Sequence, residues 1–174
     1  MRVLVTAATK YGATTEIAQA IAAVLGDHGL EAIVLPPEQV EEIEGYDAVV
    51  AGSAVYAGHW LKPAKELVER HAGGLAGRPV WLFSSGPVGD PPKPEEDPVD
   101  VAELVALTNA REHRVLAGKL VRRQLSFPER AIVSALRVPE GDFRDWTEIR
   151  NWAAEIAEAL PPRLRQPGAD EAAG

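Results

Sequence analysis

The strongest constraint on the fold is a regular alternation of short apolar runs with longer amphipathic runs. Five short runs have the length and residue content of buried strands, at positions 2–6, 31–35, 47–52, 78–84 and 113–117. Longer runs with helical spacing lie between them, at 14–25, 62–71 and 99–109. Strands that alternate with helices predict βαβ crossovers, which build a parallel sheet with helices on both faces. We therefore expect an α/β three-layer sandwich with a five-stranded parallel sheet. The alternation does not determine the strand order, for which we take 2-1-3-4-5.

A capped helix is predicted to close this unit. Asp145 and Glu148 have the spacing of a capping box, with Asp in place of the usual Ser or Thr. An apolar stripe follows at Ile149, Trp152, Ala153, Ile156 and Leu160. Two prolines at 161–162 end the helix, and residues 163–174 are small, polar and without pattern. We expect a single domain over residues 1–162 and a disordered tail over 163–174.

Composition excludes several classes of protein. The chain has no cysteine among its 174 residues, which excludes disulfides, thiolate metal sites and a cysteine nucleophile. Its four histidines lack metal-binding spacing, so we expect no metal site. The net charge of -8 disfavours nucleic acid as a partner. No apolar run is long enough to span a membrane and the first residues lack signal-peptide features, so we expect a cytoplasmic protein.

The loop after the first strand has the composition of a phosphate site. In a sheet of this kind, ligands bind beyond the carboxyl ends of the strands, where the winding reverses. Residues 9–14 combine Gly12 with the hydroxyls of Thr9 and Thr14 and open a helix, whose free N–H groups favour an anion. An ordinary turn capped by threonine is the alternative. Neither GxGxxG nor GxxxxGK[ST] occurs, so a dinucleotide fingerprint and a nucleotide P-loop are not indicated.

The loops after the third and fourth strands suit a flat aromatic ligand. Residues 52–60 contain two glycines together with Tyr56, His59 and Trp60, which offers aromatic stacking and close approach of the backbone. Residues 84–89 are small and turn-rich, as a second wall would be, although strand ends often have this composition. His59 is a candidate proton donor or ring contact, and packing or solvent exposure is the alternative.

The first loop resembles the hydroxyl-rich [ST]-x-[ST]-G-x-T segment that flavodoxins wrap round the phosphate of FMN. Thr9, Gly12 and Thr14 fit this pattern, whereas Tyr11 and Ala13 depart from it. A closer resemblance, over almost the whole chain to residue 160, is to the menaquinone-dependent protoporphyrinogen dehydrogenases. It rests on residues 8–18, Tyr46-Asp47, Gly52 with Gly58-His59-Trp60, and Asp145-Trp146.

This resemblance implies a flavodoxin-like fold that binds one FMN without a covalent bond. The phosphate would be held largely by backbone N–H groups of the first loop, and the flavin ring would lie between the second and third loops. Backbone groups near Ala57 and Gly58 would meet the ring nitrogen N5. The residues expected to bind the cofactor are Thr9, Lys10, Tyr11, Gly12, Ala13, Thr14, Val55, Tyr56, Ala57, Gly58, His59, Trp60, Ser85, Gly86, Pro87 and Val88.

Three functions follow as hypotheses. The first is an FMN-dependent oxidoreductase similar to these dehydrogenases, which passes electrons from a planar donor such as a porphyrinogen to a quinone. The second is a small electron carrier that docks to redox partner proteins, and the third is an interaction module without flavin. Residues 90–98 are acidic and proline-rich where the family has a longer basic segment, which argues against a porphyrin substrate.

A basic segment interrupts the acidic chain. Residues 111–137 carry seven Arg or Lys against two Glu, a net +5, which leaves -13 on the rest of the chain. Apolar residues at helical spacing predict a helix over 127–137. We interpret the segment as a surface helix whose arginines pair with the acidic body. The alternative is a docking surface for the inner face of a membrane, a redox partner or the propionates of a porphyrin.

Overall fold

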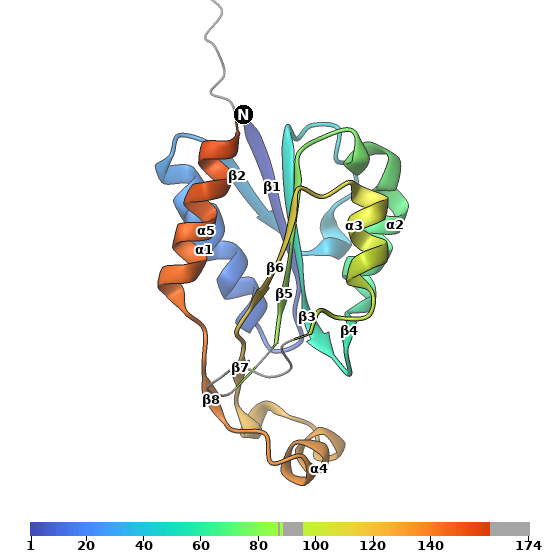
Figure 1. Ribbon diagram of the computed structural model, residues 1–174, viewed down its shortest axis with the longest axis vertical. Helices are drawn as coiled ribbons and strands as arrows, with labels where there is room; N and C mark the ends of the chain where they lie inside the picture. Colours follow the sequence, from blue (N-terminus) through green and yellow to red (C-terminus); the bar gives the residue numbers. More distant parts are fainter. Residues whose placement is uncertain (87, 89–95, 161–174) are drawn as a thin grey trace, which may run out of the picture.

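The computed structural model describes residues 1–86, 88 and 96–160. Its main sheet contains five parallel strands: β1 (Arg2–Ala8), β2 (Glu31–Leu35), β3 (Ala48–Tyr56), β5 (Val80–Ser85) and β6 (Glu112–Leu116). They lie in the order β2-β1-β3-β5-β6 (Figure 1). This is the predicted order, and the expectation of a flavodoxin-like α/β sandwich is confirmed.

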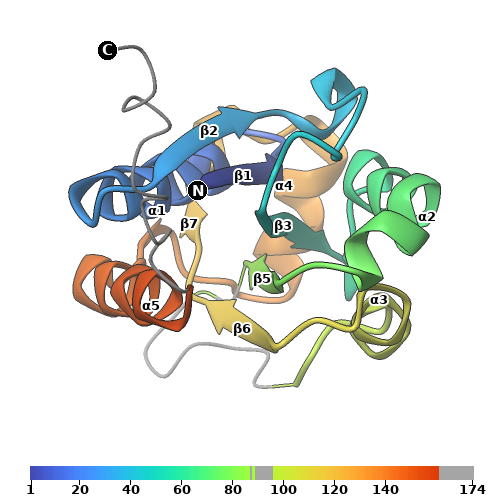
Figure 2. The same cartoon turned by 90° about the horizontal axis from the view of Figure 1, so that it is seen from above.

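Two helices cover each face of the sheet. α1 (Ala13–Asp27) and α5 (Trp146–Ala159) pack on one face, and α2 (Lys62–Ala76) and α3 (Val101–Thr108) pack on the other (Figure 2). Successive side chains of a strand point to opposite faces. Val3 and Val5 therefore belong to the core under α1 and α5, while Leu4 belongs to the core under α2 and α3.

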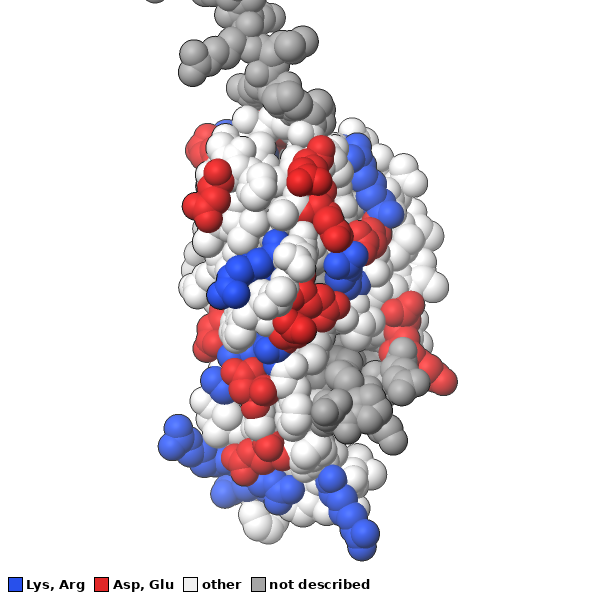
Figure 3. All heavy atoms as spheres, turned by 60° about the vertical axis from the view of Figure 1, so that its left-hand side comes forward, with Lys and Arg blue, Asp and Glu red and all other residues white. Residues whose placement is uncertain are grey.

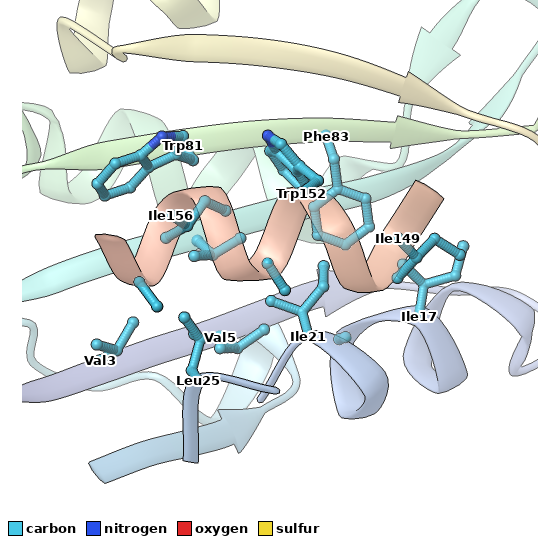
Figure 4. Packing of buried hydrophobic residues seen from close by; sticks show 14 of the residues in the cluster. Val3, Val5, Ile17, Ile21, Leu25, Trp81, Phe83, Ile149, Trp152 and Ile156 are labelled. Atoms are coloured by element: carbon cyan, nitrogen blue, oxygen red, sulfur yellow. The ribbon is translucent and has the colours of Figure 1, made fainter. Parts of the chain in front are cut away.

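The α5 helix has the start and the buried face that its sequence predicts. The Asp145 carboxylate accepts hydrogen bonds from the backbone N–H groups of Thr147 and Glu148, at 2.9 and 3.0 Å. The whole predicted stripe is buried, and the Trp152 ring meets Phe83 edge-on with centroids 6.0 Å apart (Figure 4). Burial of an aliphatic or aromatic side chain stabilises the fold by roughly 1.5–3 kcal/mol.

The α2 helix is longer than its sequence predicts. The pattern indicates an end at residue 71, before Gly73-Gly74, and that prediction is wrong because the helix continues to Ala76. Gly74 lies against Ile43, since a Cβ on Gly74 would be 2.8 Å from the Ile43 Cδ1 atom. The glycine at this position therefore permits close packing rather than ending the helix.

A short hairpin at the carboxyl end of β3 was not predicted. β4 (His59–Trp60) pairs antiparallel with the last residues of β3. Ala57 and Gly58 form the two-residue turn between the strands and have φ angles of +50° and +79°. Positive φ at both central residues is typical of a type I′ turn, which suits the twist of a hairpin.

Residues 121–140, which we call the 121–140 excursion, leave the sandwich and return to it. The ribbon of β7 (Lys119–Leu120) and β8 (Gly141–Asp142) closes it, and it contains α4 (Phe127–Ala135), which projects from the sandwich (Figure 1). The helix predicted at 127–137 is confirmed, with an earlier end. No side chain of α4 is buried. Basic side chains gather at this end of the molecule (Figure 3).

Some expectations fall outside this description. The expected tail at 163–174 and most of the acidic segment at 90–98 lie outside the described residues. Two short 3-10 helices complete the described elements, η1 (Pro37–Gln39) and η2 (Arg122–Gln124). In the described ranges, no helix combines the length and the apolar character needed to cross a bilayer.

Candidate functional site

Most of the predicted cofactor residues line two adjoining cavities at the carboxyl edge of the sheet. The first cavity has a volume of about 160 Å³ and brings the first loop together with the ends of β3 and β5. The second has a volume of about 390 Å³ and lies between the hairpin turn and the residues before α3. Val55 and Gly86 line both cavities, so the two spaces meet at these residues.

The first cavity contains the elements of an anion site. Gly12 is the N-cap of α1 with a φ of +89°, and no side chain caps this helix. The Thr9 hydroxyl accepts a hydrogen bond from the Gly12 N–H group at 2.9 Å, which closes the loop on itself. N–H groups in the first turn of a helix have no partner within the helix. The amides of Ala13 and Thr14, two residues that line this cavity, are therefore available to a phosphate.

The second cavity is walled by segments that are distant in the sequence. The hairpin turn forms one side, with Ala57 and Gly58, and Val99 forms another. The Val99 N–H group donates to the Gly58 carbonyl at 2.8 Å and ties the two walls together. Gly86 lines both cavities and Gly118 lines the first, and a Cβ on Gly118 would be 2.9 Å from the Gly86 Cα atom, so the two backbones approach too closely for a side chain at Gly118.

Two predicted ring contacts lie outside the lining of these cavities. Trp60 is 2% exposed and packs in the core under α2, where its indole N–H group donates to the Ser84 hydroxyl at 2.7 Å. The His59 Nδ1 atom lies 3.1 Å from the Asp100 carboxylate, and its side chain is half-exposed. A role for His59 as proton donor stays a prediction, and Pro87 is outside the described residues.

A polar network of Ser84, His113 and Asp97 borders the second cavity and was missed by sequence reasoning. The Ser84 hydroxyl is 2.8 Å from the His113 Nε2 atom, and His113 Nδ1 is 3.3 Å from the Asp97 carboxylate. Because the Trp60 indole already donates to Ser84, the serine proton points to His113. Burial lowers the pKa of His113 and Asp97 opposes part of that effect, so the imidazole is held neutral. Ser84 and Asp97 both line the second cavity.

Lys10 and Tyr11 contact the 121–140 excursion. The Lys10 ammonium pairs with the Glu129 carboxylate and lies 5.4 and 5.2 Å from the ring centroids of Tyr11 and Tyr56. The Tyr11 hydroxyl donates to the other Glu129 oxygen at 2.5 Å, and the Ser126 N–H group donates to it at 2.8 Å. These bonds hold the pKa of the Glu129 carboxyl well below its usual range. Nothing in the local sequence pattern signals this contact.

A buried arginine, Arg144, connects the start of α1 to β8. Arg144 is 8% exposed and binds the Asp142 carboxylate through two hydrogen bonds, at 2.8 and 2.6 Å. Its remaining N–H groups reach Glu16 at 2.7 Å and the Ala13 carbonyl at 3.1 Å. Arg144 therefore ties the first turn of α1 to β8, and its guanidinium holds the pKa of the Asp142 carboxyl below its usual range.

A doubly wound parallel sheet with two adjoining cavities at its carboxyl edge defines a flavodoxin-like protein. Residues 4–147 match the family model described as "Flavodoxin domain", and the chain belongs to this family. Membership of the family indicates FMN as the cofactor. The two joined cavities and the free amides at the α1 start fit a phosphate attached to a flat ring. Within the described part of the chain, no cluster of His, Cys, Asp and Glu suits a metal ion.

Relatives and solved structures agree with this assignment. The chain is 28% identical over 172 residues to "Protoporphyrinogen IX dehydrogenase [quinone]" of Escherichia coli (strain K12), which covers 90% of this chain and 95% of that protein. Flavodoxin 2 from Bacillus cereus, in its oxidised crystal structure, has a TM-score of 0.64 at 21% identity, over 92% of this chain and 100% of that one. A flavodoxin from the domain Archaea has a TM-score of 0.64 at 16% identity, over 91% and 98%.

Proposed function

We propose that this protein is an FMN-dependent oxidoreductase that takes electrons from a planar donor and passes them to a quinone. The observation that carries the proposal is its similarity to the Escherichia coli enzyme, which extends over 90% of this chain rather than over a single motif. When bound, FMN supplies the redox chemistry, and the protein binds, orients and shields it.

The proposal assigns a task to each loop. The amides of the loop at 9–14 bind the phosphate, assisted by the Thr9 and Thr14 hydroxyls. The hairpin turn at Ala57 and Gly58 offers backbone groups to the polar edge of the ring. Ser85, Gly86 and Val88 form the other side of the first cavity. Ser84, which bonds the neutral His113 imidazole, also lines the second cavity.

The donor is the less constrained partner. Glu96 and Asp97 line the second cavity, and their negative charge disfavours an electron donor that places carboxylates beside them. A porphyrinogen carries propionates, so it must present its macrocycle with those groups turned away. We keep porphyrinogen as the first donor to test because the similar Escherichia coli protein is named as its dehydrogenase.

We also propose that α4 makes peripheral contact with the inner face of the cytoplasmic membrane. Phe127 and Leu136 are 80% and 71% exposed. Within the basic segment, Arg114 of β6 pairs with Glu112 and Glu155, as expected for arginines that pair with the acidic body. By contrast, no described residue forms an ion pair with Arg123, Arg130 or Arg137. Exposed apolar side chains beside free arginines favour an anionic lipid surface.

The alternative is a small electron carrier that docks to partner proteins. The likeness of the whole described fold to flavodoxins supports it. Family membership in turn favours both redox functions over an interaction module without flavin.

Rapid mixing of the reduced holoprotein with a quinone tests the proposed function. Anaerobically reduced protein, mixed with menadione, is expected to be reoxidised in one two-electron process, and protoporphyrinogen is the first donor to be tried for steady turnover. Reoxidation by menadione no faster than by buffer would exclude the quinone reaction. Reduction in two separated one-electron steps, without turnover of any planar donor, would support the carrier.

A further inference from the structure

A third cavity lies between α4 and the cofactor loops. Its volume is about 460 Å³, which exceeds the volume of either cavity at the predicted cofactor site. Ile132, Val133 and Leu136 form the wall on the side of α4. The opposite wall is also apolar and is formed by Leu120, Val121 and Leu125, of which Leu125 is buried.

This cavity adjoins the predicted position of the flavin ring. Ala57 lines both the third cavity and the second cavity, where we expect the flavin ring. Tyr56 lines both the third cavity and the first cavity, where we expect the phosphate. A molecule in the third cavity would therefore border both spaces predicted for the cofactor, at Tyr56 and Ala57.

The polar groups in the lining restrict the chemistry of the ligand. Tyr56 and Gln124 can donate hydrogen bonds, and Lys119 is a cation. Burial raises the pKa of the Tyr56 hydroxyl to about 12, so this group stays protonated and remains a donor. Glu16 and Glu129 also face the cavity, and their carboxylates are already paired with Arg144 and Lys10. The remaining hydrogen-bond donors and the apolar walls fit a ligand with carbonyl acceptors and an apolar body.

A network of polar contacts holds α4 in place over the cavity. Glu129 joins the helix to Lys10 and Tyr11 of the first loop, and also accepts from the Ser126 N–H group at the start of the helix. Ile132 and Leu136 are 58% and 71% exposed, so the apolar wall continues to the protein surface. A hydrocarbon chain could leave the cavity along these two residues.

We propose that the third cavity is the quinone-binding site, with a ring carbonyl bound by the Tyr56 hydroxyl and the apolar part between Val133 and Leu125. The inference rests on the proposed function and assigns its acceptor to named residues. In the reaction the quinone gains two electrons and two protons from the reduced cofactor and leaves as the hydroquinone, and the cofactor is returned to its oxidised form. Val133 and Leu136 then determine which quinones bind.

The test fills the cavity from α4. Val133→Trp places a large ring in the lining, and Ser134→Trp, on an exposed position of the same helix that does not line the cavity, is the matched control. Equilibrium dialysis of menadione against each FMN-loaded protein measures binding without turnover. We expect affinity to fall about tenfold or more in Val133→Trp, and to stay within about twofold in Ser134→Trp. FMN affinity, measured by quenching of flavin fluorescence, should be unchanged in both.

The possible outcomes separate this inference from the proposed function. Unchanged menadione affinity in a Val133→Trp protein of normal FMN affinity, or no menadione binding to the wild type, would overturn the inference. If Val133→Trp does not fold, Leu136→Asp decides, because Leu136 is exposed and a carboxylate there should weaken binding at least about threefold. If menadione binding depends on Val133 but menadione does not reoxidise the reduced protein, the proposed function is refuted and the proposed site is kept. If the two tryptophan variants are reoxidised at equal rates and bind menadione with equal affinity, the proposed site is refuted and the proposed function is kept.

Discussion

Replacement of Gly12 by alanine should strain the loop that is predicted to bind the phosphate. Gly12 has a φ of +89°, and among the described residues no atom beyond its chain neighbours and the backbone of its own helix lies within 4 Å of the position that a Cβ would occupy. The cost is therefore conformational, at about 1–2 kcal/mol for an L-residue in the left-handed region. Alanine also restricts the unfolded chain, which offsets about 0.4–1 kcal/mol. We expect a net loss of about 1 kcal/mol in the free energy of unfolding of the apoprotein.

The control is Gly73→Ala in α2. Gly73 also has open space around its Cβ position but lies inside a helix, so the same substitution should stabilise the protein by about 0.5–1 kcal/mol. Urea unfolding, followed by tryptophan fluorescence, measures both variants. If the Gly12→Ala loop relaxes to relieve its strain, the cost moves from stability to FMN affinity, at about tenfold in Kd for each 1.4 kcal/mol.

The two measurements must therefore be made on the same proteins. A Gly12→Ala variant with wild-type stability and wild-type FMN affinity would refute the reasoning, because the strain would then have no consequence. A loss of both stability and FMN affinity in Gly73→Ala would also contradict the reasoning, since that position is remote from the loop.

Three further predictions test other parts of the structure. Gly52→Ala should lower the free energy of unfolding by about 1–3 kcal/mol or more, because its Cβ would overlap the Phe83 ring, and thermal unfolding checks this. Ala57→Gly should raise the free energy of unfolding by up to about 1 kcal/mol, since Ala57 has a φ of +50°. Ala57→Val should lower it, and urea unfolding measures both variants. The folded pKa of Glu129 is depressed, so its ion pair with Lys10 is fully stabilising above the ordinary carboxyl pKa and weakens as pH falls towards the folded value. The protection of α4 amides, relative to their intrinsic exchange rates at each pH, should fall below about pH 4.5, and Glu129→Gln should abolish that dependence.

Local patterns predicted the sandwich well because each of its elements carries its own signal. The strand at Glu31–Leu35 has the bounds that its apolar run indicates. Asp145 caps α5 as its spacing with Glu148 predicts, and the buried face of the helix follows the apolar stripe. Periodicity reports which face of an element is buried, and in a parallel sheet this is enough to arrange the layers.

The same patterns could not predict contacts between distant segments. Glu129 meets Lys10 across 119 residues of chain, and His113 meets Ser84 across 29. Such pairs depend on where two elements end in space, and neither partner alters the periodicity around it. Gly74 shows a related limit, because a glycine that permits close packing has the same sequence signal as a glycine that ends a helix.

The candidate site was predicted in its loops but not in its boundaries. Residues 9–14 and the turn at Ala57 and Gly58 line the predicted cavities, apart from Gly12, which shapes the first loop from within. Trp60 has the composition of a ring contact, yet the short β4 strand turns its side chain into the core. Residue type identified the loop, and only the backbone path determined which of its side chains face the cavity.

The visible spectrum of the purified protein tests the central claim most directly. The protein is mixed with excess FMN, freed of unbound cofactor and scanned before and after anaerobic reduction. We predict an equimolar amount of bound flavin with quenched fluorescence, whose absorbance is bleached by reduction and restored by menadione. A colourless protein that retains no FMN after this treatment would contradict it.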